Sequence, residues 1–234
     1  MKQTRHAGLT PLRLGFTLLG LCVTSFVDQG LAQGVYGSTY QIDGAFPLGV
    51  FAQSFKPGIG AHAEFYVESE GYLRFSVLGG FTWWNLDGDK INERYVADGG
   101  KGSLQLGGHM AAVPLMLGVK LLSPEGGLRV YGLLDLGMTI NSGKVSGQRI
   151  ENGSVTTTID KSQTKLDLGL NLGGGCLLPV SKVVSIDFAA RYHLVKRDTY
   201  YSYDLYGNPS AASTDKYITV SLGVTYAFST AGSQ

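Results

Sequence analysis

The chain has 234 residues and an almost balanced charge, with 19 basic and 18 acidic residues. Charged residues make up only 16% of the sequence, so no strong field of one sign argues for nucleic acid or another polyanion as a partner. The 34 glycines are dispersed through apolar segments and are not placed at every third position, which excludes a collagen-like chain.

The first 32 residues predict an export signal that is cleaved. The positive charges of Lys2, Arg5 and Arg13 surround the start of the segment, an apolar run follows at residues 14–27, and small residues then offer a cleavage point. The apolar run is shorter than the roughly 20 residues of a membrane-spanning helix, and no later stretch reaches that length. Cleavage changes the formal charge from +1 to −1.

From residue 33 onward the sequence predicts strands, because large apolar residues alternate with small or polar ones at period two. Each predicted strand is long enough to cross a bilayer at a tilt, which takes about 9–11 residues. In chain order the predicted strands cover residues 35–46, 59–68, 73–84, 104–122, 128–140, 165–178, 184–194 and 217–228.

Two of these strands carry a special feature. The fourth contains Pro114, which cannot donate a ladder hydrogen bond and therefore predicts a bulge or a missing bond. Between the fifth and sixth strands, the polar residues 141–163 contain Asn152-Gly153, which favours a type I′ hairpin turn. We therefore expect the fifth and sixth strands to continue beyond the membrane. Residues 87–102 are expected to form a long polar loop.

The last strand has the clearest pattern. One face carries large aliphatic side chains and ends in Tyr226 and Phe228, while the other face carries only small residues. A soluble sheet would expose Lys, Glu or Gln on its wet face, so we expect the large side chains to face lipid and the small ones to face a narrow lumen.

The strand number is even, and the connections alternate between long and short, as in bacterial outer-membrane barrels. The sequence thus predicts an all-β fold: a transmembrane antiparallel up-and-down β-barrel of eight strands at residues 33–228, with short periplasmic turns and long outer loops. Residues 229–234 form a short C-terminal tail.

The pattern resembles the eight-stranded outer-membrane β-barrel family typified by OmpA and OmpX. Its most specific piece is similar to the C-terminal targeting signal of that class and consists of Ser221, Gly223, Tyr226 and Phe228. The resemblance implies recognition by the outer-membrane assembly machinery, location in a bacterial outer membrane, and contact with its lipid and lipopolysaccharide. The tail departs from the family pattern, which ends at the terminal aromatic residue.

Charged residues of both signs fall on the faces predicted to point inward. Because side chains just fill the interior of an eight-stranded barrel, we expect a network of ion pairs and hydrogen bonds, with a polar conduit as the alternative. The network is predicted to contain Glu64, Glu68, Asp135, Asp167 and Asp187 as acids and Arg74, Lys120, Arg129, Lys165 and Arg191 as bases.

A lipid-A-modifying enzyme would need a serine nucleophile and a histidine base. Ser76, Ser185 and Ser221 are available, and His62 could lie beside Glu64 on an inward face. Residues inside a filled barrel would not easily meet a lipid, so we expect no catalytic site.

No cofactor or metal site is expected either. The polar residues 87–93 could suggest calcium binding, but Ile91 stands where a ligand would be needed, which favours a solvated loop.

Aromatic residues form two further groups. Tyrosines in the predicted loop 200–215 could recognise a surface ligand or form an interface belt, and they are Tyr200, Tyr201, Tyr203 and Tyr206. Aromatic residues near strand ends are expected to form membrane-interface girdles, and they are Phe46, Tyr72, Trp83, Trp84, Tyr226 and Phe228.

The leading functional hypothesis is a non-enzymatic outer-membrane barrel with a structural or surface-interaction role through its outer loops. A narrow porin-like channel or a conduit for small apolar solutes is the second hypothesis, and a lipid-A-modifying enzyme is the third. A soluble lipocalin-like barrel is the rival at the level of the fold, because alternation alone does not say which face is inside.

Overall fold

The computed structural model describes residues 35–69, 71–124, 126–196 and 214–228. The predicted signal peptide and C-terminal tail lie outside these residues. So do the four loop tyrosines Tyr200, Tyr201, Tyr203 and Tyr206.

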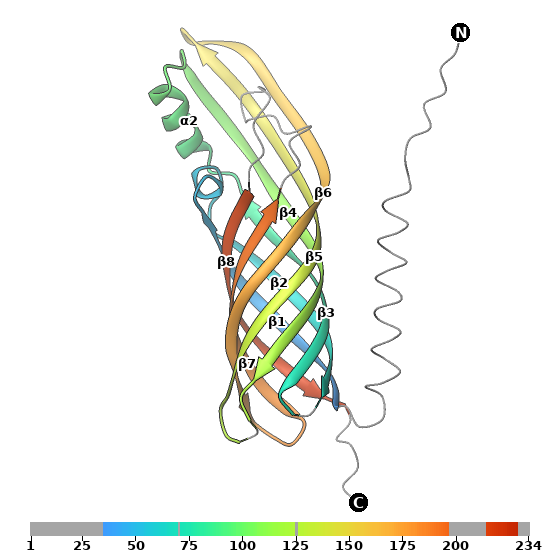
Figure 1. Ribbon diagram of the computed structural model, residues 1–234. Coiled ribbons are helices and arrows are strands. Elements are labelled where there is room, and N and C mark those ends of the chain that lie inside the picture. Colours follow the sequence, from blue (N-terminus) through green and yellow to red (C-terminus); the bar gives the residue numbers. More distant parts are fainter. Residues whose placement is uncertain (1–34, 70, 125, 197–213, 229–234) are drawn as a thin grey trace, which may run out of the picture.

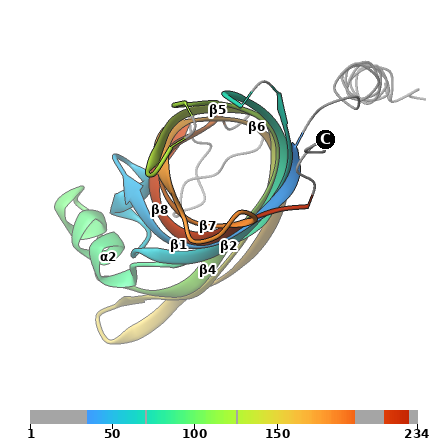
Figure 2. The same ribbon diagram turned by 90° about the horizontal axis from the view of Figure 1, so that it is seen from below.

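The eight predicted strands are all present. They are β1 (Val35–Leu48), β2 (Gly58–Ser69), β3 (Leu73–Asn85), β4 (Ser103–Leu122), β5 (Arg129–Glu151), β6 (Ser154–Pro179), β7 (Val184–Lys196) and β8 (Thr214–Ala227). Each strand pairs antiparallel with the next, and β8 pairs back onto β1 from Gly37↔Ala227 to Leu48↔Lys216. The sheet is therefore a closed up-and-down barrel, as Figures 1 and 2 show from the side and from below. This confirms the predicted fold class.

The two ends of the barrel differ. At the lower end in Figure 1 the strands are joined by short turns, and at the upper end the paired strands β4, β5 and β6 rise well above the rest of the wall. The turn between β5 and β6 is formed by Asn152 and Gly153, whose φ values of 51° and 75° match the predicted type I′ turn. The two strands therefore continue past residues 140 and 165, as far as Glu151 and Ser154, and the predicted long hairpin is present.

Burial alternates along the strands as the sequence predicts. The outward side chains Ile42, Leu136 and Leu168 are 67%, 62% and 64% exposed, whereas inward side chains such as Thr39 are buried. The aliphatic face therefore lies outside and the small and polar face lies inside. A soluble lipocalin-like barrel would need the opposite arrangement, since its apolar face must be the interior.

Pro114 interrupts the hydrogen-bond pairing of β4 with β3 and does not cause a bulge. Pairing between β3 and β4 stops after Gly79↔Leu115 and resumes at Thr82↔Ala112 in the same register. On the other side of β4 the ladder with β5 runs through Pro114 without a break. The proline therefore interrupts only the edge toward β3.

The prediction of a loop at residues 87–102 was wrong in one respect, because this segment contains helix α2 (Gly88–Ala97). Ile91 is buried on this helix and packs with Leu86 and Leu104, while Tyr95, one turn further on, packs against the same cluster. The spacing of Ile91 and Tyr95 places both on one helix face. Among the described residues, no helix is long and apolar enough to cross a membrane.

Leu136→Arg should destabilise the barrel in lipid vesicles, because the side chain at this outward position would face hydrocarbon. We expect a loss of about 2–4 kcal/mol in the free energy of unfolding if the site lies near the bilayer midplane. We call the band of exposed outward aliphatic side chains around the barrel, which includes Leu136 and Leu168, the aliphatic belt. Ser162→Arg is the matched control, since Ser162 is exposed on the same outward face but lies in the extension of β6 above this belt. Equal stability of the two variants in a urea titration would contradict the assignment of the belt.

Candidate functional site

The centre of the lumen holds a buried ion cluster built from four strands. Lys120 Nζ on β4 lies 2.7 Å from Glu64 Oε2 on β2, and both side chains are 1% exposed. Arg191 Nη2 on β7 lies 3.6 Å from the same carboxylate oxygen. Arg191 also lies 3.7 Å from Asp135 on β5 and donates to Gln41 Oε1 at 2.8 Å. The cluster thus links opposite walls of the barrel.

A second ion cluster lies at the lower end. Glu68 accepts from Arg74 at 2.6 Å and from Arg129 at 3.0 Å. Arg129 also donates to the carbonyl oxygens of Gly71 and Ser123, which belong to two different lower turns. The arginine therefore ties the β2–β3 turn to the β4–β5 turn.

Three predicted members of the network make no ion pair with a described residue. Asp187 is buried and accepts from Tyr131 Oη at 2.6 Å. Asp167 is buried and accepts from Asn141 Nδ2 at 2.7 Å. Lys165 is half-buried and lies opposite Asn141 on β5. The structure thus joins seven of the ten predicted residues by ion pairs, holds Asp187 and Asp167 with neutral donors, and leaves Lys165 outside the network.

His62 and Ser221 do not form a direct serine–histidine pair. His62 Nδ1 lies 2.5 Å from Asp43 Oδ2, whereas the expected neighbour Glu64 is paired with Lys120. Ser221 Oγ donates to Asp43 Oδ1 at 2.5 Å, so the carboxylate lies between serine and histidine. A serine nucleophile needs a direct contact with its base. His62 and Ser221 are also buried inside the barrel.

Aromatic side chains close the upper end of the lumen. Phe51, from the short 3₁₀ helix η1 (Phe51–Gln53), contacts Trp84 of β3 edge to face with ring centroids 5.3 Å apart. Trp84 contacts Tyr217 of β8 at 5.0 Å, and Tyr217 stacks on His193 at 4.2 Å. We call these four residues and Val195 the aromatic stopper; all five are buried.

This position corrects the sequence prediction for Trp84. We expected it in a membrane girdle, but it is fully buried, because its place in the alternation of β3 points inward. The other predicted girdle residues, Phe46, Tyr72, Trp83, Tyr226 and Phe228, are all exposed by 37% or more.

Apolar side chains close the lower part of the lumen. Leu122, Tyr131, Leu133, Leu177 and Ala189 form one buried cluster there. The central ions thus lie between an aromatic layer and an aliphatic layer. The lumen resembles the core of a soluble domain more than a pore, since its lining side chains contact one another.

The predicted assembly signal lies where β8 closes the barrel. Ser221 points inward, whereas the rings of Tyr226 and Phe228 lie outside with centroids 5.9 Å apart. A Cβ added to Gly223 would lie 2.2 Å from the carbonyl oxygen of Tyr40 on β1. Glycine at this position therefore has a structural reason of its own, because it lets β8 approach β1.

Helix α2 and the parts of β4, β5 and β6 that rise above the barrel wall form a projection at the upper end, which we call the platform. α2 lies beside the extended strands in Figures 1 and 2. Leu104 N donates to Asn92 Oδ1 at 2.7 Å. Leu86 N donates to the carbonyl oxygen of Gly108 at 3.0 Å. Both contacts engage backbone groups of β4, so the segment containing α2 covers the upper edge of this strand. Among the described residues no group of three or more His, Cys, Asp or Glu side chains could hold a metal ion.

The opposite edge of the platform differs. β7 pairs with β6 only between Leu168 and Pro179. From Ser154 to Asp167, β6 therefore has a described neighbouring strand on one side only, namely β5. We call this stretch the open edge of β6. Its sequence contains four threonines and a valine and an isoleucine, which favour strand pairing. The sequence predicted the hairpin, but not that the described strands cover only one of its two flanks.

No protein-family model matches the chain, and no curated protein matches it in sequence. Among solved structures, Neisserial surface protein A is similar with 14% identity and a TM-score of 0.47, over 82% of this chain and 97% of that chain. Ail, the attachment invasion locus protein of Yersinia pestis, shows 16% identity and a TM-score of 0.47, over 84% and 99%. The outer membrane protease OmpT from Escherichia coli shows 8% identity and a TM-score of 0.43, over 84% and 97%. The assignment of the barrel rests on its own strand register and not on these similarities.

Glu64→Gln should be strongly destabilising, because it leaves the buried Lys120 ammonium without its counter-charge. Losing one partner of a buried ion pair costs about 3–5 kcal/mol. Adding Lys120→Met removes the orphaned charge and should recover a large part of that loss. Urea unfolding in vesicles measures the free energy of unfolding of the original protein and both variants. A double variant no more stable than Glu64→Gln would show that the unpaired Lys120 charge is not the cause of the loss.

Proposed function

We propose that this protein resides in a bacterial outer membrane and acts without catalysis, by binding a partner at its projecting platform. The apolar outward face supports the membrane location. In lipid every backbone polar group must be paired internally, and a closed barrel meets that demand. The exposed aromatic residues near both strand ends are typical of membrane-interface girdles.

The filled lumen argues against the alternative of a channel. A conducting path would have to pass the aromatic stopper, the central ion cluster and the lower aliphatic layer in turn. The side chains of all three layers are at most 6% exposed. Their displacement would separate buried ion pairs, which is costly.

The absence of access argues against catalysis in the lumen. His62 and Ser221 share the carboxylate of Asp43 inside the wall, where neither a lipid nor a peptide can reach them. The platform offers a surface that a partner can reach without any opening of the barrel.

The observation that carries the proposed binding function is the open edge of β6. Edge strands present rows of backbone donors and acceptors and can pair with another chain unless the fold covers them. In this platform the corresponding edge of β4 is covered, whereas no described strand pairs with the backbone of β6 along its outer edge between Ser154 and Asp167. The fitting partner is an extended polypeptide segment that adds as a further strand.

Reconstituted protein should give no steady ionic current across a planar bilayer, because side chains fill the lumen from end to end. The measurement is a current recording at fixed voltage, with a known open porin as positive control. Single-channel steps that scale with the amount of inserted protein would support the channel instead.

Proline substitutions at Thr157 and Thr158 test the open edge. Successive N–H groups of a strand point to opposite sides, so one of the two prolines removes a donor from the open edge and the other removes one from the ladder with β5. We expect one variant to keep its stability but lose retention of protein-bearing vesicles on a surface coated with unfolded casein.

Electrophoresis of unheated and boiled samples supplies the folding control, since a compact band that shifts on boiling marks a folded barrel. Retention of both variants at the level of the original protein would overturn binding at the open edge. A protein that fractionates as soluble and shows no shift would overturn the membrane location itself.

A further inference from the structure

Two lysines mark the upper limit of the aliphatic belt on one side of the barrel. On β7 the outward positions end with Leu194 and then Lys196, and on β8 they begin with Thr214, followed by Lys216 and Ile218. Both lysines are exposed. They are the first charged side chains that the outward face of these two strands presents above the belt.

The strand register brings the two lysines together. Lys196 lies opposite Thr214, and Lys216 lies opposite Leu194, so the lysines occupy diagonal positions on one face of the β7–β8 pair. Diagonal neighbours in an antiparallel pair are about 7–8 Å apart, within reach of one small anion for side chains of this length. Asp215 lies between them in sequence but is buried on the inner face.

Neither lysine forms an ion pair with a residue in the described part of the chain. On β6, the strand beside Lys196, the outward residue at its level is Leu168, and the first outward acid further up is Asp160. Two ammonium groups thus lie side by side above an apolar wall, and no carboxylate of the described residues pairs with either of them. An anion from the surroundings would relieve their mutual repulsion.

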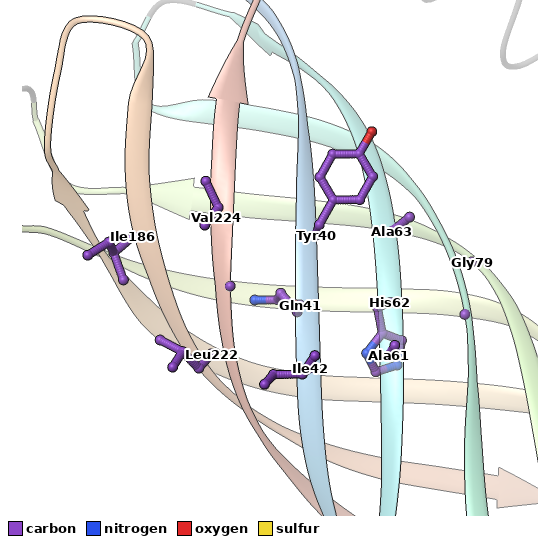
Figure 3. Close-up of a pocket in the computed structure, with 12 residues that line it drawn as sticks. Tyr40, Gln41, Ile42, Ala61, His62, Ala63, Gly79, Ile186, Leu222 and Val224 are labelled. Atoms are coloured by element: carbon purple, nitrogen blue, oxygen red, sulfur yellow. The ribbon is translucent and has the colours of Figure 1, made fainter.

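An apolar depression lies lower on the same side of the barrel. It has a volume of about 790 Å³ and is lined by residues of β1, β2, β3, β7 and β8. Figure 3 shows Tyr40 and Ile42 on β1 between Leu222 and Val224 on one side and Ala61 and Ala63 on the other. Small side chains at Ala61, Ala63 and Gly79 form its floor, and larger exposed ones surround it.

The vertical separation of the two features matches one leaflet of a bilayer. From Lys216 to Leu222 there are six residues, or about 20 Å along β8 at about 3.3 Å per residue. Barrel strands tilt by about 40°, so the drop along the membrane normal is about 15 Å. That is about half of the roughly 30 Å hydrocarbon thickness. A lipid with its headgroup at the lysines would therefore end its acyl chains near the level of the depression.

We infer that the β7–β8–β1 wall is a binding site for a phosphorylated, acylated lipid of the outer leaflet. Its phosphate lies between Lys196 and Lys216, and one acyl chain passes Ile218 and Phe46 into the depression. The lipid A part of lipopolysaccharide has this chemistry. The inference rests on the proposed membrane location, but not on the proposed binding at the open edge of β6.

The test compares binding of lipid A with binding of dephosphorylated lipid A in phosphatidylcholine vesicles. Lys196→Gln with Lys216→Gln should weaken binding of the phosphorylated form by about fivefold for each lysine. Lys144→Gln is the matched control, because Lys144 is an exposed outward lysine on β5, opposite Ser162 and away from the pair. We expect it to leave binding unchanged.

Ala63→Leu tests the depression separately, because the larger side chain fills its floor. It should weaken binding several-fold and leave the preference for the phosphorylated lipid intact. Unchanged affinity in this variant would overturn the acyl-chain part of the inference.

Equal affinity of the double lysine variant and the original protein, or equal loss in Lys144→Gln, would overturn the phosphate site. The shift in mobility on boiling must persist in every variant as evidence of a folded barrel. If the original protein lacks that shift, the membrane location fails and the lipid site fails with it. If the original protein shows the mobility shift but binds lipid A and dephosphorylated lipid A equally well, the lipid site alone is overturned.

Discussion

The pairing of β8 with β1 is the contact on which the rest of the structure depends. It removes both edges of the sheet within the barrel, so the backbone groups of the wall pair with neighbouring strands, apart from the interruption beside Pro114. Closure also fixes which face is inside, because a strand shifted by one residue would exchange its apolar and polar faces. Gly223 contributes directly, since a side chain there would collide with the backbone of β1. The end of the chain thus completes the barrel.

The interior follows from this closure. An eight-stranded ring leaves room for side chains but not for an open bore. Charges placed there are shielded from water and need partners from another wall, which Lys120 and Arg191 find in Glu64. The aromatic stopper and the lower aliphatic layer keep water away from these pairs at both ends. Function is therefore expected on the surfaces of the barrel and its platform.

The sequence was most informative about features that repeat along one strand. Period-two alternation predicted eight strands and their faces, and the Asn152-Gly153 turn predicted the long hairpin. Contacts between distant strands were less accessible. His62 pairs with Asp43 and not with Glu64, because the register between β1 and β2 decides which inward residues meet. Helix α2 was not predicted because most of its residues are polar and its apolar face is short. The location of Trp84 was wrong because tryptophan is typical of girdles, whereas its position in the alternation of β3 places the side chain inside the barrel.

The long hairpin has a mechanical consequence. β5 and β6 are paired from Arg129↔Leu177 at the lower end to Glu151↔Ser154 at the tip, so one ladder runs from the wall into the platform. If a partner binds along β6 as proposed, a force on it directed away from the barrel would load this ladder parallel to its strands. The hydrogen bonds would then share the force in shear and would not open one after another. The barrel thereby anchors the platform, and the platform can bear tension without any change in the lumen.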